Sequence, residues 1–118
     1  MSVSLDLDLI MNKLVMELGA KLYFILIISE NGVVIKSYIN EEEFNKAAIG
    51  VNISQLYELA EEITNEIGIH TPDFNIIHSD NFYVLSIKIL ENVIILLTED
   101  QIDLNQVFNI INNSLKTD

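Results

Sequence analysis

The sequence predicts an α+β fold, in which helices pack on one five-stranded antiparallel sheet in the order α-β-β-α-β-β-β-α. The chain has 118 residues, half of them hydrophobic, which suits one domain with an ordinary core. Apolar runs of strand length alternate with pairs of turn residues, and three other segments repeat apolar residues at helical spacing. Because no linker, repeat or low-complexity tract interrupts this pattern, we expect a single domain over residues 1–118.

The first helix and the first hairpin have clear local signals. Apolar residues recur at helical spacing from about residue 5 to residue 18, and Gly19 is the expected C-cap. The run KLYFILIIS, residues 21–29, is almost continuously apolar and reads as a buried strand. Asn31-Gly32 then separates it from the run VVIKSY, and this pair favours a type I′ turn. We therefore expect an antiparallel hairpin.

The longest helix is predicted to begin at Asn40 and to end near Ile67, before Gly68. Asn40 is followed by three glutamates, an arrangement that suits the positive end of a helix dipole. One narrow apolar stripe is expected to face the core; its members are Ile49, Ile53, Leu56, Ala60, Ile63 and Ile67. The opposite side is apolar in its first half, so that half needs cover from a second surface.

Gly50 lies inside this helical pattern, where glycine costs about 1 kcal/mol relative to alanine. In one interpretation the helix breaks at Gly50 and restarts from Asn52. In the other, which we favour, small residues let another helix pass close by, that helix being the same helix of a second subunit. The residues on this side are Phe44, Ala47, Gly50, Val51 and Ser54.

Three strands and a helix are expected to complete the fold. FNIIHS, FYVLSIKIL and VIILLT read as strands, separated by polar turn residues of hairpin type. Asp100 or Asp103 caps a last segment whose apolar residues keep helical spacing as far as Leu115. On the first of these strands Phe74, Ile76 and His78 share one face.

Charge and composition exclude several classes of function. The chain has 18 acidic residues, six lysines, no arginine and a formal net charge of −12, so phosphate backbones and anionic membrane surfaces are poor partners. It has no cysteine, which removes thiol nucleophiles and thiolate metal sites. The N-terminal segment lacks the basic region of a signal peptide, and no run approaches the roughly 20 apolar residues of a membrane span. We expect a cytoplasmic protein that binds no nucleic acid and does not insert into a membrane.

No catalytic, metal or cofactor site is predicted. The two histidines, His70 and His78, lack the spacing that places two ligands on one helix face. Glycines form no nucleotide-binding loop, and no serine lies in a nucleophile elbow. The acidic residues of the long helix are read as a solvated face or as a docking surface for a basic partner; they are Glu58, Glu61, Glu62 and Glu66.

Element order and two local signatures resemble the roadblock/dynein light chain domain family over nearly the whole chain. FILIISENGVVIKS is similar to the first hairpin of that family, and VIILLTEDQIDLNQV to its last strand and the start of its final helix. Here the family's Asn-Leu pair is reversed as Leu104-Asn105, and its common turn glycine is missing. The resemblance implies a roadblock/profilin-like α/β/α sandwich.

The resemblance also implies a non-enzymatic interaction module. Family members form dimers through an edge strand and the long helix, which here implies a homodimer interface made by Phe44, Ala47, Gly50, Val51, Ser54, Phe74, Ile76 and His78. Such dimers commonly scaffold or regulate small Ras-like GTPases, and this chain has no arginine with which to supply an arginine finger. The alternatives are a longin- or profilin-like trafficking or cytoskeletal adaptor and, more distantly, a sensor with a small-ligand pocket beneath the long helix.

Overall fold

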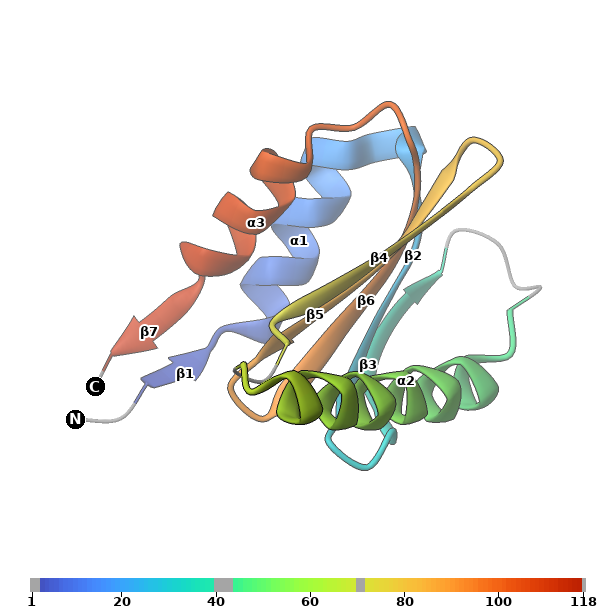
Figure 1. The fold of residues 1–118 in the computed structure, drawn as a ribbon. Helices are drawn as coiled ribbons and strands as arrows, with labels where there is room; N and C mark the ends of the chain where they lie inside the picture. The colour runs from blue at the N-terminus through green and yellow to red at the C-terminus, as the bar shows by residue number, and fades with distance from the viewer. Residues whose placement is uncertain (1–2, 40–43, 70–71, 118) are drawn as a thin grey trace.

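A computed structural model describes residues 3–39, 44–69 and 72–117 (Figure 1). Its main sheet has five antiparallel strands in the spatial order β3-β2-β6-β5-β4, which confirms the predicted fold class. The strands are β2 (Leu22–Ser29), β3 (Val34–Ile39), β4 (Phe74–Ser79), β5 (Phe82–Ile89) and β6 (Asn92–Glu99). The helices are α1 (Leu7–Leu18), α2 (Lys46–Ile67) and α3 (Leu104–Asn112), with a short 3-10 turn at Gly19–Lys21 after α1.

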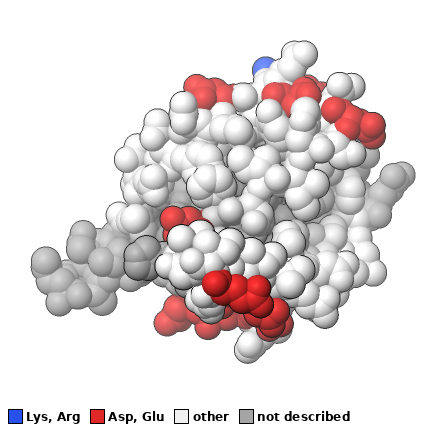
Figure 2. Space-filling view, in the orientation of Figure 1, with Lys and Arg blue, Asp and Glu red and all other residues white. Residues whose placement is uncertain are grey.

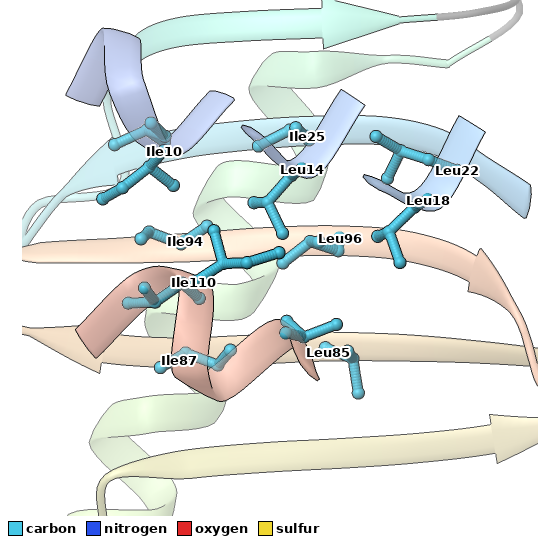
Figure 3. Packing of buried hydrophobic residues seen from close by; sticks show 13 residues of the cluster. Ile10, Leu14, Leu18, Leu22, Ile25, Leu85, Ile87, Ile94, Leu96 and Ile110 are labelled. Atoms are coloured by element: carbon cyan, nitrogen blue, oxygen red, sulfur yellow. The ribbon is translucent and has the colours of Figure 1, made fainter. Parts of the chain in front are cut away.

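The sheet is the middle of three layers. Helices α1 and α3 cover one face and α2 lies across the other (Figure 1). Between the sheet and the α1/α3 layer, α1 contributes Ile10, Leu14 and Leu18, which point toward β2, β5 and β6 (Figure 3). A second core lies on the α2 side, where Ile53 and Tyr57 pack on β2 and β6. The continuous apolar runs of β2 and β6 follow from burial on both faces.

The first hairpin is confirmed, but its turn differs from the prediction. A type I′ turn needs positive φ at both central residues, whereas here only Gly32 of the pair has it, at 84°. Four residues, from Glu30 to Val33, connect β2 to β3, and the register shifts between Ile27 and Ile28. The prediction therefore placed the strands correctly and counted too few loop residues.

Helix α2 is continuous through Gly50, so the predicted alternative of a break there is wrong. The helix begins at Lys46, where the Asn45 side chain accepts a hydrogen bond from the backbone N–H of Ala48 at 3.1 Å. The predicted start was Asn40, and residues 40–43 lie outside the described part of the chain. Phe44 therefore precedes the helix instead of belonging to it.

A two-stranded ribbon joins the segment before α1 to the segment after α3, and no local pattern in the sequence predicts it. Strand β1 (Val3–Leu5) pairs antiparallel with β7 (Leu115–Thr117). Residue Leu115, which we had assigned to the last helix, belongs to this ribbon. The predicted cap of that helix is correct in one of its two forms, because Asp103 accepts a hydrogen bond from the backbone N–H of Asn105 at 2.9 Å.

Candidate functional site

The two edges of the main sheet differ in their protection against pairing with another strand. On β3, Lys36 forms a 2.6 Å ion pair with Asp8, and the register shift in β2 disturbs the pairing. Strand β4 has no charged residue or proline and pairs with β5 in unbroken register. Charges and bulges are what proteins use to block edge pairing, so β4 is the open edge.

The structure confirms that Phe74, Ile76 and His78 share one face of β4, as predicted. Phe74, Ile76 and His78 pair with residues of β5 that belong to the α1/α3 side of the sheet. All three are exposed, although Phe74 also contacts the ring of Phe108 on α3, with ring centroids 5.0 Å apart. His78 Nε2 lies 3.1 Å from a carboxylate oxygen of Asp100, so its ring is held at the end of the edge.

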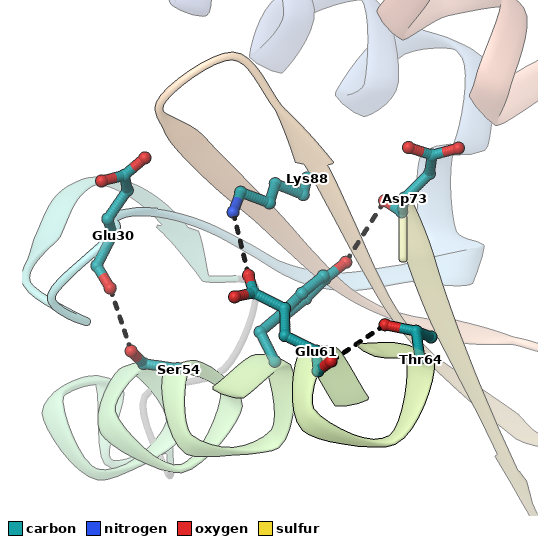
Figure 4. A network of polar contacts seen from close by, with 7 residues as sticks. Glu30, Ser54, Glu61, Thr64, Asp73 and Lys88 are labelled. Atoms are coloured by element: carbon teal, nitrogen blue, oxygen red, sulfur yellow. Dashed lines mark hydrogen bonds and ion pairs between the residues drawn. The ribbon is translucent and has the colours of Figure 1, made fainter. Parts of the chain in front are cut away.

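The glycine at position 50, inside a helix, is explained by a close contact within the same chain. A Cβ atom built on Gly50 would be 2.6 Å from the carbonyl oxygen of Gly32, in the turn between β2 and β3. The hydroxyl of Ser54 donates to the carbonyl of Glu30 in the same turn, at 3.1 Å (Figure 4). Helix α2 thus lies against its own hairpin here, and our explanation of Gly50 by a passing helix is wrong.

The other residues predicted on this side of the helix separate into two groups. Ala47 and Val51 are exposed on α2, as a contact with a second chain would need. Phe44 is half-buried in the loop before α2, where its ring meets that of Phe24 at 5.0 Å between centroids. Its place in the core contradicts the position on the outer helix face that we had predicted.

Two parallel stripes run along the exposed side of the second half of α2. Residues four apart lie on one face of a helix. The acidic stripe consists of the exposed Glu58, Glu62 and Glu66. The apolar stripe consists of Leu59, Ile63 and Ile67, which are 54%, 49% and 67% exposed.

Our assignment of Ile63 and Ile67 to the core stripe is therefore wrong, and Leu59 was missed. The helix keeps its apolar spacing beyond the part of the sheet that it covers. The sequence signal that marks these residues is the repeat of isoleucine or leucine next to glutamate every four residues. Acidic side chains gather over the region of α2 in Figure 2, with little positive charge in that view.

Glu61 differs from the other predicted acidic residues because it points toward the sheet. Its carboxylate accepts a hydrogen bond from Lys88 Nζ on β5 at 3.3 Å, and its backbone carbonyl accepts one from the Thr64 hydroxyl (Figure 4). A pocket of about 300 Å³ opens beside this pair, between α2 and the β2–β3 turn. The acidic surface available to a partner is thus the stripe of Glu58, Glu62 and Glu66.

Tyr57 fixes the inner side of α2 to the sheet. Its hydroxyl donates to the carbonyl of Ser86 at 2.7 Å, and the carbonyl of Asp73 lies 3.3 Å away. Burial raises the pKa of Tyr57 to about 12. This hydroxyl is therefore a structural donor, since it stays protonated at physiological pH.

The described residues hold no group of three or more histidine, cysteine, aspartate or glutamate side chains that could bind a metal ion. His70 lies outside the described part of the chain. No helix in that part is long and apolar enough to cross a membrane.

Comparison with known proteins gives structural similarity only. No protein-family model matches the sequence, and no curated protein matches it. Among solved structures, MglB of Myxococcus xanthus is 13% identical, with a TM-score of 0.76 over 86% of this chain and 82% of that one. A Roadblock/LC7 domain from Streptomyces avermitilis is 15% identical, with a TM-score of 0.77 over 92% and 90%.

A further MglB structure, described as having a tetrameric arrangement, is 9% identical, with a TM-score of 0.76 over 89% of this chain and 79% of that one. At these identities the similarity establishes the fold and nothing more specific. The resemblance that we read from the sequence is confirmed at that level.

Proposed function

We propose that this chain, whose fold is that of the Roadblock/LC7 domains, is a dimeric, non-enzymatic interaction module that regulates or scaffolds a small Ras-like GTPase. The observation that carries the proposal is the open edge of β4 next to the apolar stripe of α2. Both surfaces are exposed, and both have the chemistry of a contact with another chain.

The short connection between α2 and β4 supports the proposal that the apolar stripe and the β4 edge contact the same partner chain. Only six residues, from Gly68 to Asp73, separate the end of α2 from the start of β4. Ile67 at the end of the helix and Phe74 at the start of the strand are both exposed. A second copy that pairs with β4 in antiparallel register would bring its own α2 to the same side, as a two-fold axis requires.

Self-association also agrees with one of the similar structures, since an MglB structure is described as tetrameric. In the proposed dimer, Ala47, Val51 and the apolar stripe meet the second copy on the helix side, and Phe74, Ile76 and His78 flank the paired edges. Gly50, Ser54 and Phe44 support this surface from within the chain, and they are not contact residues themselves.

The charge of the chain limits what such a dimer does to a bound GTPase. It has no arginine, so it supplies no arginine finger to the transferred phosphate. Its acidic stripe, Glu58, Glu62 and Glu66, suits a basic surface outside the nucleotide site. An effect on hydrolysis would come from a shift in the population of the GTPase's own loops.

The first test is the oligomeric state, measured by size-exclusion chromatography with light scattering at micromolar concentration. We expect a dimer for the wild type and a monomer for Ile63→Lys, because a lysine in the apolar stripe would have to lose its hydration where the two copies meet. Met16→Lys is the matched control, since Met16 is 82% exposed on α1 in the opposite layer. A monomeric wild type, or a dimeric Ile63→Lys variant, contradicts the proposed interface.

The second test is a binding assay with the host's small GTPases, each loaded with GDP or with a GTP analogue. We expect binding that depends on the nucleotide and that weakens when Glu58, Glu62 and Glu66 are together changed to glutamine. Equal binding in both nucleotide states, or none, rules out the role as a regulator and leaves the dimer to be explained otherwise.

A further inference from the structure

The face of the sheet that α2 covers is left open near the β4–β5 hairpin. A groove of about 390 Å³ lies there, and its walls are mainly aromatic and aliphatic side chains. It is lined by Tyr23, Phe44, Ser79, Asp80, Phe82, Val84 and Leu97. In Figure 1 this hairpin extends away from α2, which lies across the other end of the strands.

Phe82 stands between this groove and a second hollow of different chemistry. The second hollow, of about 350 Å³, is lined by Phe82 together with the polar residues Asn81, Glu99, Asp100 and Gln101. Phe82 is 37% exposed, and its ring makes an edge contact with Tyr23, with ring centroids 5.5 Å apart. An apolar subsite and an acidic subsite therefore share one wall.

The charges around Phe82 are predominantly negative. Asp80 lines the groove, and Glu99 accepts a hydrogen bond from the Tyr23 hydroxyl at 3.1 Å. Asp100 is paired with His78 at 3.1 Å. One positive charge lies nearby, because Lys21 Nζ donates a hydrogen bond to the carbonyl of Gln101 at 2.9 Å. Three carboxylates against one ammonium favour a cationic group beside the apolar groove.

We propose that these two adjoining hollows form a docking site for a basic segment of another protein, which places an aromatic or aliphatic side chain in the groove and a neighbouring lysine or arginine beside Glu99. A second copy of this chain does not suit the site. It has no arginine, its six lysines never occur in pairs, and its net charge of −12 would bring acid to acid. The site meets the proposed dimer edge only at the His78–Asp100 pair, and it does not depend on any GTPase.

The test uses a short synthetic peptide, KKWLKK, and exploits the absence of tryptophan from this chain. Burial of the peptide's tryptophan is then read directly as a blue shift of its fluorescence, and amide chemical shifts of the labelled protein map the site. We expect saturable binding with shifts centred on the groove. The peptide KKSSKK, which keeps the charge, should bind at least tenfold more weakly.

Two pairs of variants separate the apolar from the ionic contribution. Phe82→Ser should weaken binding at least tenfold, whereas Met16→Ser, at an exposed apolar site in the other layer, should leave it unchanged. Asp80→Asn removes one negative charge, so it should weaken binding about threefold and reduce the salt dependence of binding. Asparagine also tolerates the φ of 54° at this position, so the turn should keep its conformation. Glu91→Gln, at an exposed turn outside both hollows, is the control for Asp80→Asn.

Several results would overturn the proposal. Equal binding of KKSSKK would mean that charge alone attracts the peptide. Chemical shifts centred on the stripes of α2 would place the binding there instead. A change in oligomeric state on Phe82→Ser would assign the groove to a second copy of this chain.

Discussion

Replacement of Gly50 by alanine should destabilise the protein, although alanine is the better helix former. The added Cβ atom would lie 2.6 Å from the Gly32 carbonyl oxygen, whereas ordinary van der Waals contact begins near 3.4 Å. The hairpin turn and the helix must therefore separate by about 0.8 Å, the difference of these distances. Both atoms in the contact are held by backbone, so no side-chain rotation relieves it.

Two opposing effects determine the size of the loss. Overpacking of a rigid contact costs roughly 3 kcal/mol, at the upper end of the usual range, because backbone must move on one side or the other. The gain in helix propensity from glycine to alanine is about 1 kcal/mol. The expected net loss is about 2 kcal/mol, or roughly 30-fold in the folding equilibrium constant.

The assay is urea unfolding followed by circular dichroism at one fixed protein concentration, since self-association would make the stability depend on concentration. Ala48→Gly is the matched control, because Ala48 is exposed on the same helix and should show only the propensity loss of about 1 kcal/mol. A Gly50→Ala variant as stable as the wild type, or more stable, would refute the close contact with Gly32.

Two further substitutions test other contacts. Tyr57→Phe should cost about 1 to 2 kcal/mol by urea unfolding, because the buried carbonyl of Ser86 loses its donor. The Tyr57 pKa is about 12 in the folded protein against 10.0 unperturbed, so its contribution is complete below pH 10 and falls as the pH rises to 12. Between pH 10 and pH 12 the free energy of unfolding should therefore fall by about 2 to 3 kcal/mol more in the wild type than in Tyr57→Phe. An equal fall in both proteins would contradict the burial of the hydroxyl. Leu90→Asn should raise the melting temperature by about 3 °C, because Leu90 has a φ of 55° that asparagine adopts more easily, whereas Leu90→Ala should give no such gain.

The local signals in the sequence were sufficient for the sheet and for most helix ends. Strands β2 and β6 are continuous apolar runs because both of their faces are covered, and Asp103 was already a predicted cap. The start of α2 was wrong because asparagine precedes a helical pattern at both Asn40 and Asn45, and the chain uses the second. The contact of Phe44 with Phe24 holds the residue before Asn45 outside the helix, and no local pattern reveals that contact.

The candidate surfaces were harder to predict because they depend on distances between elements. Helical spacing shows that Ile63 and Ile67 share a face, but it does not show how far the sheet extends beneath them. Gly50 was recognised as unusual, yet its partner Gly32 lies in a turn 18 residues earlier, which periodicity cannot identify. The groove beside Phe82 combines residues of four strands, the loop before α2 and the β4–β5 turn, so it exists only once the sheet is assembled.

The ribbon of β1 and β7 is a second, two-stranded sheet that stands apart from the main sheet. It brings the segments before α1 and after α3 together on the side of these two helices, away from α2 (Figure 1). Only three residue pairs hold this ribbon together, against the seven or eight pairs that join β2 and β5 to β6. Amide protons in this ribbon should exchange with solvent long before those of β2 and β6.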